Sequence, residues 1–450
     1  MKDKRYLVFG AGISGVGAVK LLSTITGNIT LYDGNKELNE ETLREKVGKD
    51  RQFNILLGEL TEEAVRNTDV AVLSPGVPTD NPDVIRLKEA GAALWGEVEL
   101  AYRFDKGTIL AITGTNGKTT TTSLVGEIVK AYKDEVLVTG NIGVAYTGCV
   151  GETTDTSTTV LEISSFQLET TIDFHPRVSA ILNITPDHLD RHHTFENYAQ
   201  AKYDIAKNQT EDDTIVLNYD DELLRKFGER PDLKPEVTFF SSSSKLNKGL
   251  YLDGKRIIYN DGKQEHFLLA TDEMKLLGRH NYENVMAACG VCIAAGVPLD
   301  VIVKTVKEFN AVEHRIEFVT EKKGVRYYND SKGTNPDAAI KAVEAMERPT
   351  VLIGGGYDKN SDYDEWIKSF GDKVKLLVLI GQTREKIAES AKRLGFENVV
   401  ICDTFEEAVK TCMDAAKPGD AVLLSPACAS WGMFKNYEER GRIFKELVRR

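Results

Sequence analysis

The sequence predicts an α/β fold with parallel sheets, divided into several domains. Short apolar runs of strand length alternate with helix-like periodic segments along all 450 residues, and this alternation is typical of parallel sheets covered by helices. A single hydrophobic core rarely grows beyond about 250–300 residues, so the chain needs two or three domains. Strand–loop–helix series begin at Tyr6, at Ile109 and near Val325. We therefore expect domains at residues 1–97, 98–312 and 313–450, with boundaries placed to within several residues.

The predicted strands are the apolar runs that end before glycine-rich or polar loops. They lie at 6–9, 29–32, 70–73, 109–112, 159–163, 180–184, 325–328, 350–353, 376–380 and 421–424, and helices are predicted at 16–22, 121–130 and 198–208. Residues 237–270 differ, because Asp253-Gly254 and Asp261-Gly262 interrupt β-prone runs. Asp-Gly pairs favour tight hairpin turns, so this region is predicted to be a small antiparallel insertion in the second domain.

The composition is that of a soluble globular protein, with 28% charged and 41% hydrophobic residues. Asp and Glu number 69 against 57 Lys and Arg, a net charge of −12, which disfavours nucleic acids and anionic membranes because both need a basic face. The apolar runs are too short for a membrane span or a signal peptide. Cys289 and Cys292 lie in an apolar, small-residue segment, which favours a buried helix face over a redox or metal site. We expect a cytoplasmic protein.

The first glycine-rich loop is the GxGxxG sequence at Gly10–Gly15, between a predicted strand and a predicted helix. Its glycines allow a tight turn and the close approach of an anion to a helix N-terminus. Asp33 ends the next strand, where an acid can accept a ribose hydroxyl. This motif alone is weakly specific, so three interpretations stay open: a turn needed only for packing, NAD, or another diphosphate. The last is favoured because the loop would bind a pyrophosphate and not a nicotinamide.

The second glycine-rich loop, Thr113-Gly114-Thr115-Asn116-Gly117-Lys118-Thr119-Thr120, is the most specific motif. Backbone N–H groups and the helix N-terminus can bind phosphates, Lys118 can neutralise the β- and γ-phosphates, and Thr119 can bind Mg²⁺. The full P-loop spacing would place glycine where Ile112 stands. A plain glycine turn still does not explain Gly-Lys followed by threonines, so the loop predicts binding of a nucleoside triphosphate.

Other polar side chains follow predicted strands of the second domain. Glu162 ends an apolar strand, where it can supply the hard oxygen ligand that Mg²⁺ prefers. His188 follows the strand at 180–184 and can bind a metal or orient a carboxylate, although a hydrogen-bonding loop histidine is the commoner case. From the pattern alone, Lys202 is predicted to be a solvated helix lysine, and His192 and His193 to be exposed neighbours.

The last third of the chain offers groups that bind anions. Arg315 can either reach a γ-phosphate or form a surface ion pair. Lys332 and Thr334, after the strand at 325–328, can together bind a carboxylate. The remaining candidates are Lys359, which follows Gly354-Gly355-Gly356, the hydroxyls of Ser425-Pro426-Ala427-Cys428-Ala429-Ser430, and Phe434.

Taken together, these segments resemble the Mur ligase family over the whole chain. The shared features are residues 113–120, Glu162, Asp187-His188 and His314-Arg315. Residues 330–336, 425–430 and 434–441 resemble the branch that adds D-glutamate, although Gly333 stands where that branch more often has alanine. The resemblance implies a Rossmann-like first domain, a central P-loop-type ATPase domain with a mainly parallel sheet plus a small antiparallel sheet, and a Rossmann-like C-terminal domain.

The resemblance also implies a reaction and its site residues. ATP would activate UDP-N-acetylmuramoyl-L-alanine as an acyl phosphate, which D-glutamate would attack in peptidoglycan precursor synthesis by a monomeric enzyme. Lys118, His188 and Lys202 are implied to be catalytic. Two Mg²⁺ ions are implied, held by Thr119, Glu162, His188 and a carbamylated Lys202. The implied contacts of ATP are Gly114, Thr115, Asn116, Gly117, Lys118, Thr119, Thr120, Asn284, Arg315 and Asp330; those of the UDP substrate are Ile13, Ser14, Asp33, Ser74, Pro75, Gly76, Asn141 and Gln167; those of D-glutamate are Lys332, Thr334, Lys359, Ser425 and Phe434.

Three alternatives remain at this stage. A related Mur-type or folylpolyglutamate-type ligase would use another acceptor, and Ser331-Lys332-Gly333-Thr334 argues for glutamate. A non-catalytic nucleotide sensor would not need Glu162, His188 and Lys202. A dehydrogenase would not need the triphosphate loop. Two glycine loops in one chain imply two phosphate-bearing ligands.

Overall fold

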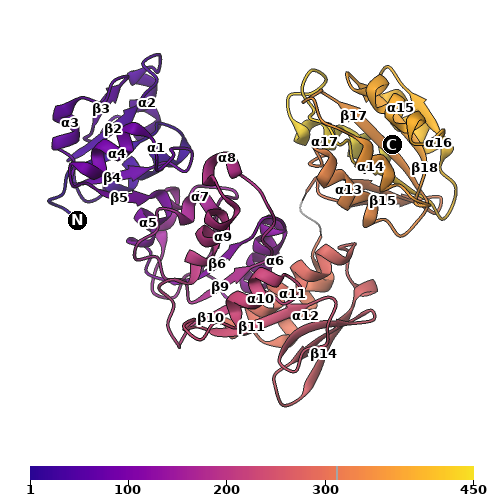
Figure 1. Ribbon diagram of the computed structural model, residues 1–450, viewed down its shortest axis with the longest axis horizontal. Coiled ribbons are helices and arrows are strands. Elements are labelled where there is room, and N and C mark those ends of the chain that lie inside the picture. Colours follow the sequence, from indigo (N-terminus) through magenta and orange to yellow (C-terminus); the bar gives the residue numbers. More distant parts are fainter. Residues whose placement is uncertain (311–312) are drawn as a thin grey trace. The chain divides into compact units, whose positions relative to one another are not determined.

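The computed structural model describes residues 1–310 and 313–450 and contains three sheets with helices packed on them (Figure 1). The predicted α/β fold is confirmed. The chain forms two compact units: Met1–Ala270 with Glu283–Val306, and Thr271–Tyr282 with Lys307–Arg450. Unit 1 holds the first two sheets and unit 2 holds the third. The predicted domain edge at residue 312 lies outside the described residues, and the three predicted domain ranges stay a prediction.

The first sheet is parallel throughout, in the order β3-β2-β1-β4-β5. Its strands are β1 (Tyr6–Phe9), β2 (Ile29–Asp33), β3 (Asn54–Leu57), β4 (Val70–Leu73) and β5 (Ala93–Gly96), and its helices are α1 (Ile13–Leu22), α2 (Glu40–Val47), α3 (Glu62–Arg66), α4 (Pro82–Glu89) and α5 (Glu97–Tyr102). All residues of β1 and β4 are buried, as expected for apolar strands covered on both faces. The strand order reverses between β1 and β4, and ligands of open α/β sheets bind where this happens.

The second sheet has nine strands in the order β14-β13-β12-β11-β10-β9-β6-β8-β7. They are β6 (Thr108–Thr113), β7 (Val136–Gly140), β8 (Thr158–Glu162), β9 (Val178–Ile181), β10 (Thr214–Asn218), β11 (Glu236–Ser241), β12 (Gly249–Asp253), β13 (Arg256–Asn260) and β14 (Glu265–Ala270). The hairpin turns contain Gly254 and Gly262 at φ of 59° and 89°, as the Asp-Gly pairs predict. The antiparallel insertion predicted at 237–270 is wrong for β11, which pairs in parallel with both β10 and β12. The antiparallel pairs are β12–β13 and β13–β14, and they continue the parallel sheet.

The helices of the second sheet begin with α6 (Lys118–Lys130), directly after the second glycine loop. The others are α7 (Ser165–Leu168), α8 (Leu189–His192), α9 (Phe195–Tyr203), α10 (Glu222–Gly228), α11 (Arg279–Ala294) and α12 (Leu299–Glu308). The helix predicted at 198–208 starts earlier, because the Thr194 side chain accepts a hydrogen bond from Asn197 N and caps α9. It ends at Tyr203, where a 3₁₀ turn, Asp204–Ala206, takes over. The spacing of apolar residues in the sequence does not show where an α-helix gives way to a 3₁₀ turn at its end.

The third sheet has the order β15-β16-β20-β17-β18-β19. Its strands are β15 (Glu317–Lys322), β16 (Val325–Asn329), β17 (Thr350–Gly356), β18 (Val374–Gly381), β19 (Val399–Ile401) and β20 (Ala421–Leu424), and its helices are α13 (Pro336–Glu344), α14 (Asp364–Lys368), α15 (Arg384–Arg393), α16 (Phe405–Ala415) and α17 (Tyr437–Arg449). Only the edge strand β15 is antiparallel to its neighbour. Two buried apolar clusters contain side chains of this sheet.

Two predictions from composition concern the cysteines and the apolar segments. Cys289 and Cys292 are free and fully buried on α11, as predicted, and burial raises the pKa of both thiols. Within residues 1–310 and 313–450, no helix combines the length and the apolar character that a membrane crossing needs.

Candidate functional site

The loop between β6 and α6 has the backbone of a phosphate-binding turn. Gly114 and Gly117 adopt φ of 149° and 84°, and Gly117 caps α6. A Cβ atom on Gly117 would lie 2.1 Å from Oδ1 of Asn284, on α11, so glycine is required here by both conformation and space. The first N–H groups of α6 have no partner within the helix and lie beside this loop. Asn284, another residue predicted to contact ATP, is next to them.

Neighbouring side chains hold this loop in shape. Lys118 Nζ donates to Gly114 O at 2.8 Å and to Thr115 O at 2.9 Å. Asn183, at the end of the segment after β9, accepts from Asn116 N through Oδ1 at 2.8 Å, and its carbonyl accepts from Thr115 N at 2.9 Å. Asn183 has a role that the sequence patterns did not single out, because the contact joins segments 67 residues apart.

Glu162 ends β8 with an exposure of only 1%. Its Oε1 accepts a hydrogen bond from Asn141 Nδ2 at 2.9 Å. Its Oε2 is buried and has no hydrogen-bond partner among the described residues. A buried carboxylate oxygen without a partner costs free energy, and a hard cation such as Mg²⁺ would satisfy it. The Oε2 of Glu162 therefore fits one ligand of the implied metal.

Lys202 is buried, with 2% exposure, so the pattern-based prediction of a solvated lysine is wrong. Its Nζ donates to Gly114 O at 3.0 Å and lies 4.6 Å from the centre of the Tyr198 ring. Burial, helped by the nearby Lys118 charge and opposed by Asp187, lowers the pKa of Lys202 to about 7. Much of this amine is consequently neutral at pH 7, and the neutral amine is the form that reacts with CO₂ to give a carbamate.

His188 lies on an exposed loop in a left-handed backbone conformation, φ 52°. Its Nε2 is 3.5 Å from Asp187 Oδ2, and its ring lies 4.8 Å from that of Phe166. Over the part of the chain that the structure describes, no three His, Cys, Asp or Glu side chains gather into a metal-binding group. The assignment of His188 to a metal stays a prediction.

His192 is buried, with 4% exposure, so the prediction of an exposed neighbour is wrong for this residue. Its Nδ1 lies 2.9 Å from Glu169 Oε1 and its Nε2 lies 3.0 Å from Ser165 Oγ. These contacts fix α8 against α7, the short helix that carries Gln167. His193 is exposed as predicted, beside Asp80 at 3.0 Å. A sequence pattern does not distinguish the two, because α8 is only one turn long.

The first glycine loop meets the end of β2. A Cβ atom on Gly15 would lie 1.7 Å from Gly10 O, so α1 packs directly on the loop. Asp33 Oδ2 accepts from Ala11 N at 2.8 Å. Asp33 thus holds the loop itself. Ile13, at the start of α1, is 83% exposed.

The segment after β4 reaches the same place. Ser74 N donates to Phe9 O at 3.0 Å, and Ser74 Oγ donates to Gly10 O at 3.4 Å. The structure therefore gathers Asp33, Ser74 and the first glycine loop at the switch point of the first sheet. Pro75 and Gly76 follow Ser74 in this segment, and Ser14 lies beside Ile13 at the N-terminus of α1.

Asn141 and Gln167 follow neighbouring strands of the second sheet, Asn141 directly after β7 and Gln167 on α7 after β8. Asn141 follows β7 and binds Glu162. Gln167 is 5% exposed, and its side chain accepts from Ser164 N at 2.9 Å in a capping box that starts α7. Both predicted UDP-substrate residues are thus held by hydrogen bonds within the protein.

In unit 2, Asp330 lies buried at the end of β16. It accepts from Ser425 Oγ at 2.7 Å and from Ile316 N at 3.2 Å. Burial raises the pKa of this carboxyl to about 7, which the Ser425 hydrogen bond opposes. A Cβ atom on Gly333 would lie 2.4 Å from Asp330 Oδ2, so the glycine at this position leaves room for the carboxylate.

The other predicted acceptor residues of unit 2 lie on loops or pack on the core. Lys332 Nζ is 5.9 Å from the centre of the Tyr437 ring, and Lys359 Nζ is 4.8 Å from that of Trp431. The ring of Phe434 packs on the core beside Phe405, with ring centres 5.1 Å apart. Two further predicted residues are Thr334, which is half-buried before α13, and Arg315, which is half-buried between two residues of positive φ, His314 at 68° and Ile316 at 45°.

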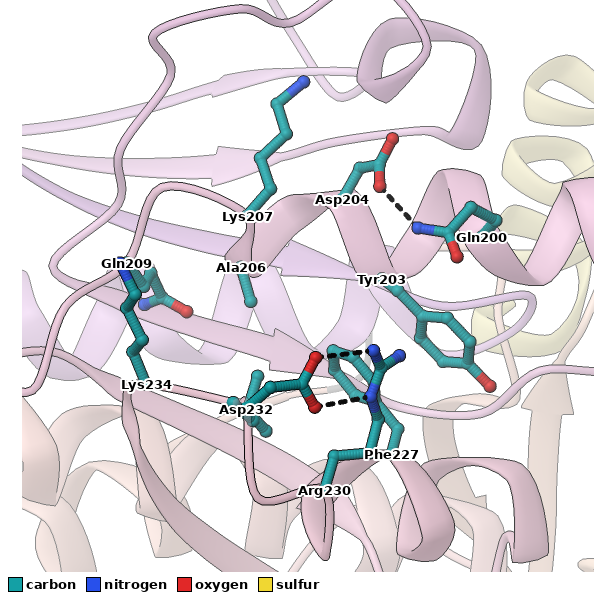
Figure 2. A pocket seen from close by; sticks show the side chains of 11 residues that line it. Gln200, Tyr203, Asp204, Ala206, Lys207, Gln209, Phe227, Arg230, Asp232 and Lys234 are labelled. Carbon is teal, nitrogen blue, oxygen red and sulfur yellow. Dashed lines mark hydrogen bonds and ion pairs between the residues drawn. The ribbon is translucent and has the colours of Figure 1, made fainter.

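A separate cavity of about 200 Å³ lies beside α9, the 3₁₀ turn after it and α10 (Figure 2). The Tyr203 and Phe227 rings stack there at 4.2 Å, and Arg230 pairs with Asp232 at 2.8 Å. None of the predicted site residues lines this cavity. We assign it no function.

Family comparisons cover most of the chain. The Mur ligase MurD-like N-terminal domain matches residues 4–96, the Mur ligase middle domain matches 112–292, and the Mur ligase glutamate ligase domain matches 314–428. A protein of Lachnospira eligens named UDP-N-acetylmuramoylalanine–D-glutamate ligase is 57% identical over 448 residues, which cover 100% of this chain and 99% of that protein. A protein of the same name from Lachnoclostridium phytofermentans is 57% identical over 99% of this chain and 98% of its own length.

A solved structure supports the fold. A crystal structure of MurF from Acinetobacter baumannii is 16% identical and superposes with a TM-score of 0.62, covering 94% of this chain and 91% of that chain. At this identity the likeness concerns the arrangement of sheets and helices alone.

Proposed function

The chain belongs to the Mur ligase family, and from this premise we propose that it is an ATP-dependent ligase that adds D-glutamate to UDP-N-acetylmuramoyl-L-alanine in peptidoglycan precursor synthesis. The observation that carries the proposal is the 57% identity over the whole chain to a ligase named for this acceptor. The loop before α6 supports the use of ATP, since Gly114 and Gly117 adopt positive φ angles before a helix N-terminus and Lys118 Nζ lies against the loop, bonded to Gly114 O.

The first step activates a carboxylate, which is otherwise unreactive toward amines. An oxygen of the substrate carboxylate attacks the γ-phosphorus of ATP, the bond to the β-phosphate oxygen breaks, and ADP leaves. Negative charge spreads over the transferring group during this step, and a fixed cation stabilises it. We assign this role to Lys118, whose ammonium group is held over the loop by two carbonyl oxygens.

Mg²⁺ would neutralise phosphate charge at this site when bound. Glu162 is the best-supported ligand because its Oε2 is buried without a partner in the described structure. We propose Thr119 and His188 as further ligands, and a carbamylated Lys202 as the ligand of a second ion. The depressed pKa of Lys202 supports the carbamate, since it leaves a neutral amine at physiological pH.

The second step forms the amide bond. The amine of D-glutamate attacks the carbonyl carbon of the acyl phosphate, inorganic phosphate leaves, and the amine loses a proton. We propose that Lys332, Thr334, Lys359, Ser425 and Phe434 hold the acceptor, and that Arg315, Asp330 and Asn284 contact ATP. The UDP portion would lie at the switch point of the first sheet, where Asp33 and Ser74 adjoin the glycine loop.

We also propose that the enzyme works in the cytoplasm as a monomer. ATP and a UDP-linked precursor are both cytoplasmic metabolites, which supports the location. Size-exclusion chromatography with light scattering would test the oligomeric state, and a stable dimer would overturn that part of the proposal.

The first test is phosphate release by the purified protein with ATP, Mg²⁺, UDP-N-acetylmuramoyl-L-alanine and D-glutamate, omitting one component at a time. We expect release to require all four and to fail with L-glutamate. Release with a different amino acid would keep the ligase chemistry and overturn the acceptor. No release with any amino acid, from folded protein that binds ATP, would overturn the catalytic proposal.

A further inference from the structure

The structure assigns Arg440 as a positioning residue that holds together the two loops proposed to bind D-glutamate. Arg440 lies on α17, and its side chain was not among the residues that the sequence motifs assigned to any ligand. This inference rests on the proposed function, because the acceptor loops, which carry Lys332 and Ser425, are assigned there.

Arg440 is 1% exposed, and its guanidinium donates hydrogen bonds from all three of its nitrogens. Nε donates to Ser331 Oγ at 2.9 Å, and Nη2 donates to Ser331 O at 2.8 Å. Nη1 donates to Cys428 O at 3.2 Å. One rigid planar group therefore binds two loops that lie about a hundred residues apart in the sequence.

Both bonded residues adjoin proposed acceptor residues. Ser331 directly precedes Lys332, and Cys428 lies on the loop that begins with Ser425. The two loops follow β16 and β20, which are neighbouring parallel strands. Ser331 Oγ also donates to Tyr437 O at 2.8 Å, which ties this contact to the first turn of α17. Arg440 therefore joins the two loops beyond the strand ends, in addition to the Ser425–Asp330 hydrogen bond between them.

Stability alone does not account for a charge at this position. Burial lowers the pKa of Arg440 to about 10, which the nearby Cys428 and Asp330 oppose, so the group stays charged at pH 7. Its three hydrogen bonds go to two carbonyls and one hydroxyl, and none of them to a carboxylate. A buried charge held this way costs desolvation free energy, and well-packed apolar residues often give equal or greater stability. What a planar guanidinium supplies, and an apolar side chain does not, is a fixed geometry between two loops.

The test compares Arg440→Lys and Arg440→Met with Arg449→Met, an exposed arginine on the same helix. We expect both Arg440 variants to raise KM for D-glutamate about ten- to hundred-fold, because displacing a binding group by about 1 Å has effects of this size. Lysine should not substitute, since one ammonium does not reproduce three directed bonds. KM for D-glutamate should be unchanged in Arg449→Met. The Kd for UDP-N-acetylmuramoyl-L-alanine should be unchanged in all three variants, because its proposed contacts lie in unit 1.

Further measurements separate positioning from folding. Thermal unfolding identifies any variant that does not fold. Ser331→Ala then removes the Oγ that accepts from Arg440 Nε, one of the three bonds, while Arg440 is retained. Millimolar guanidinium should partly restore KM in Arg440→Ala by occupying the vacated site. If Arg440→Met folds and its KM for D-glutamate is that of wild type, the inference is overturned. If Arg440→Met does not fold, wild-type KM values in both Arg440→Lys and Ser331→Ala overturn it. If wild-type protein uses a different amino acid, the acceptor proposal has failed and the same comparison is made with that amino acid.

Discussion

Lys202 shows how an environment formed by distant residues changes the chemistry of a side chain. Its position in an ordinary helix predicts solvent exposure, yet the side chain donates to a carbonyl of the loop before α6, 88 residues earlier in the chain. The helical period of α9 contains no information about that partner. The resemblance to the Mur ligases did single out this lysine, but the physical reason for its altered basicity is visible only in the folded protein.

We predict that Lys202→Ala lowers kcat by at least about 100-fold, the scale of losing one preorganised electrostatic group. Acetate should restore part of the activity, because a small carboxylate can occupy the space where the carbamate would lie. The measurement is phosphate release at increasing acetate concentrations, with the exposed Lys255→Ala variant as the control. Full activity of Lys202→Ala without acetate would remove Lys202 from the catalytic site.

Asp330 gives a prediction for stability against pH. Its folded-state pKa is raised to about 7 from 3.8 by burial, so the folded protein binds this proton more tightly than the unfolded chain. The resulting stabilisation is complete below pH 4 and is lost as pH rises toward and through 7. The loss is on the order of 4 kcal/mol for a shift of this size.

The measurement is urea unfolding of wild type and Asp330→Asn between pH 4.5 and 8. Wild type should lose stability relative to Asp330→Asn as pH rises, because asparagine has no proton to release. Asp372→Asn, which alters an exposed aspartate, corrects for effects of net charge. A constant difference between wild type and Asp330→Asn across this range would contradict the raised pKa.

At the scale of single elements, the proposed binding of ATP depends on the backbone conformation of the turn before α6. We predict that Gly117→Ala lowers ATP affinity at least about ten-fold, because its Cβ would meet Asn284 at 2.1 Å in addition to the strain of a φ of 84°. Gly254→Ala is the matched control, since Gly254 also has a positive φ but nothing lies within 4 Å of the added Cβ. It should lose about 1 kcal/mol of stability and keep its ATP affinity, measured by calorimetry.

Most strands were predictable because parallel strands covered on both faces are continuous apolar runs. β1, β4 and β20 match their predicted limits residue for residue, and the Asp-Gly turns after β12 and β13 were equally clear. The parallel pairing of β11 could not be predicted, since local sequence does not reveal whether a strand pairs in parallel or antiparallel. Helix ends were displaced where a cap or a 3₁₀ turn took over, as at Thr194 and Tyr203.

The site was predictable to the extent that its motifs are local. The glycine loops, Glu162 and the Ser331–Thr334 segment could be found by spacing or resemblance. Asn183, His192 and Arg440 could not, because each acts through a contact with a residue remote in sequence or on another element. A motif search therefore finds side chains proposed to bind a ligand more easily than side chains that position other residues.

At the scale of the whole molecule, the UDP substrate should stabilise unit 1 and leave unit 2 unchanged, whereas the proposed contacts of ATP lie in both units. All proposed contacts of UDP-N-acetylmuramoyl-L-alanine lie in unit 1, and a ligand present at 100 times its Kd stabilises the part that binds it by about 2.7 kcal/mol. We predict that this ligand slows hydrogen exchange in the first sheet and α1, and leaves β17 and β18 unchanged. ATP alone serves as the comparison. Protection of β17 and β18 by the UDP substrate would contradict the assignment of its contacts to unit 1.

The course of the chain between the units has a consequence for folding during synthesis. Thr271–Tyr282 belongs to unit 2, although Glu283–Val306 returns to unit 1. Leu277, in the first of these segments, packs on the core of unit 2. The ribosome adds about 5–20 residues per second, so Leu277 waits on the order of ten seconds for the remainder of its unit. Until then Leu277 lacks the core on which it packs in the folded protein, so a chaperone that covers exposed apolar side chains would act on this part of the nascent chain.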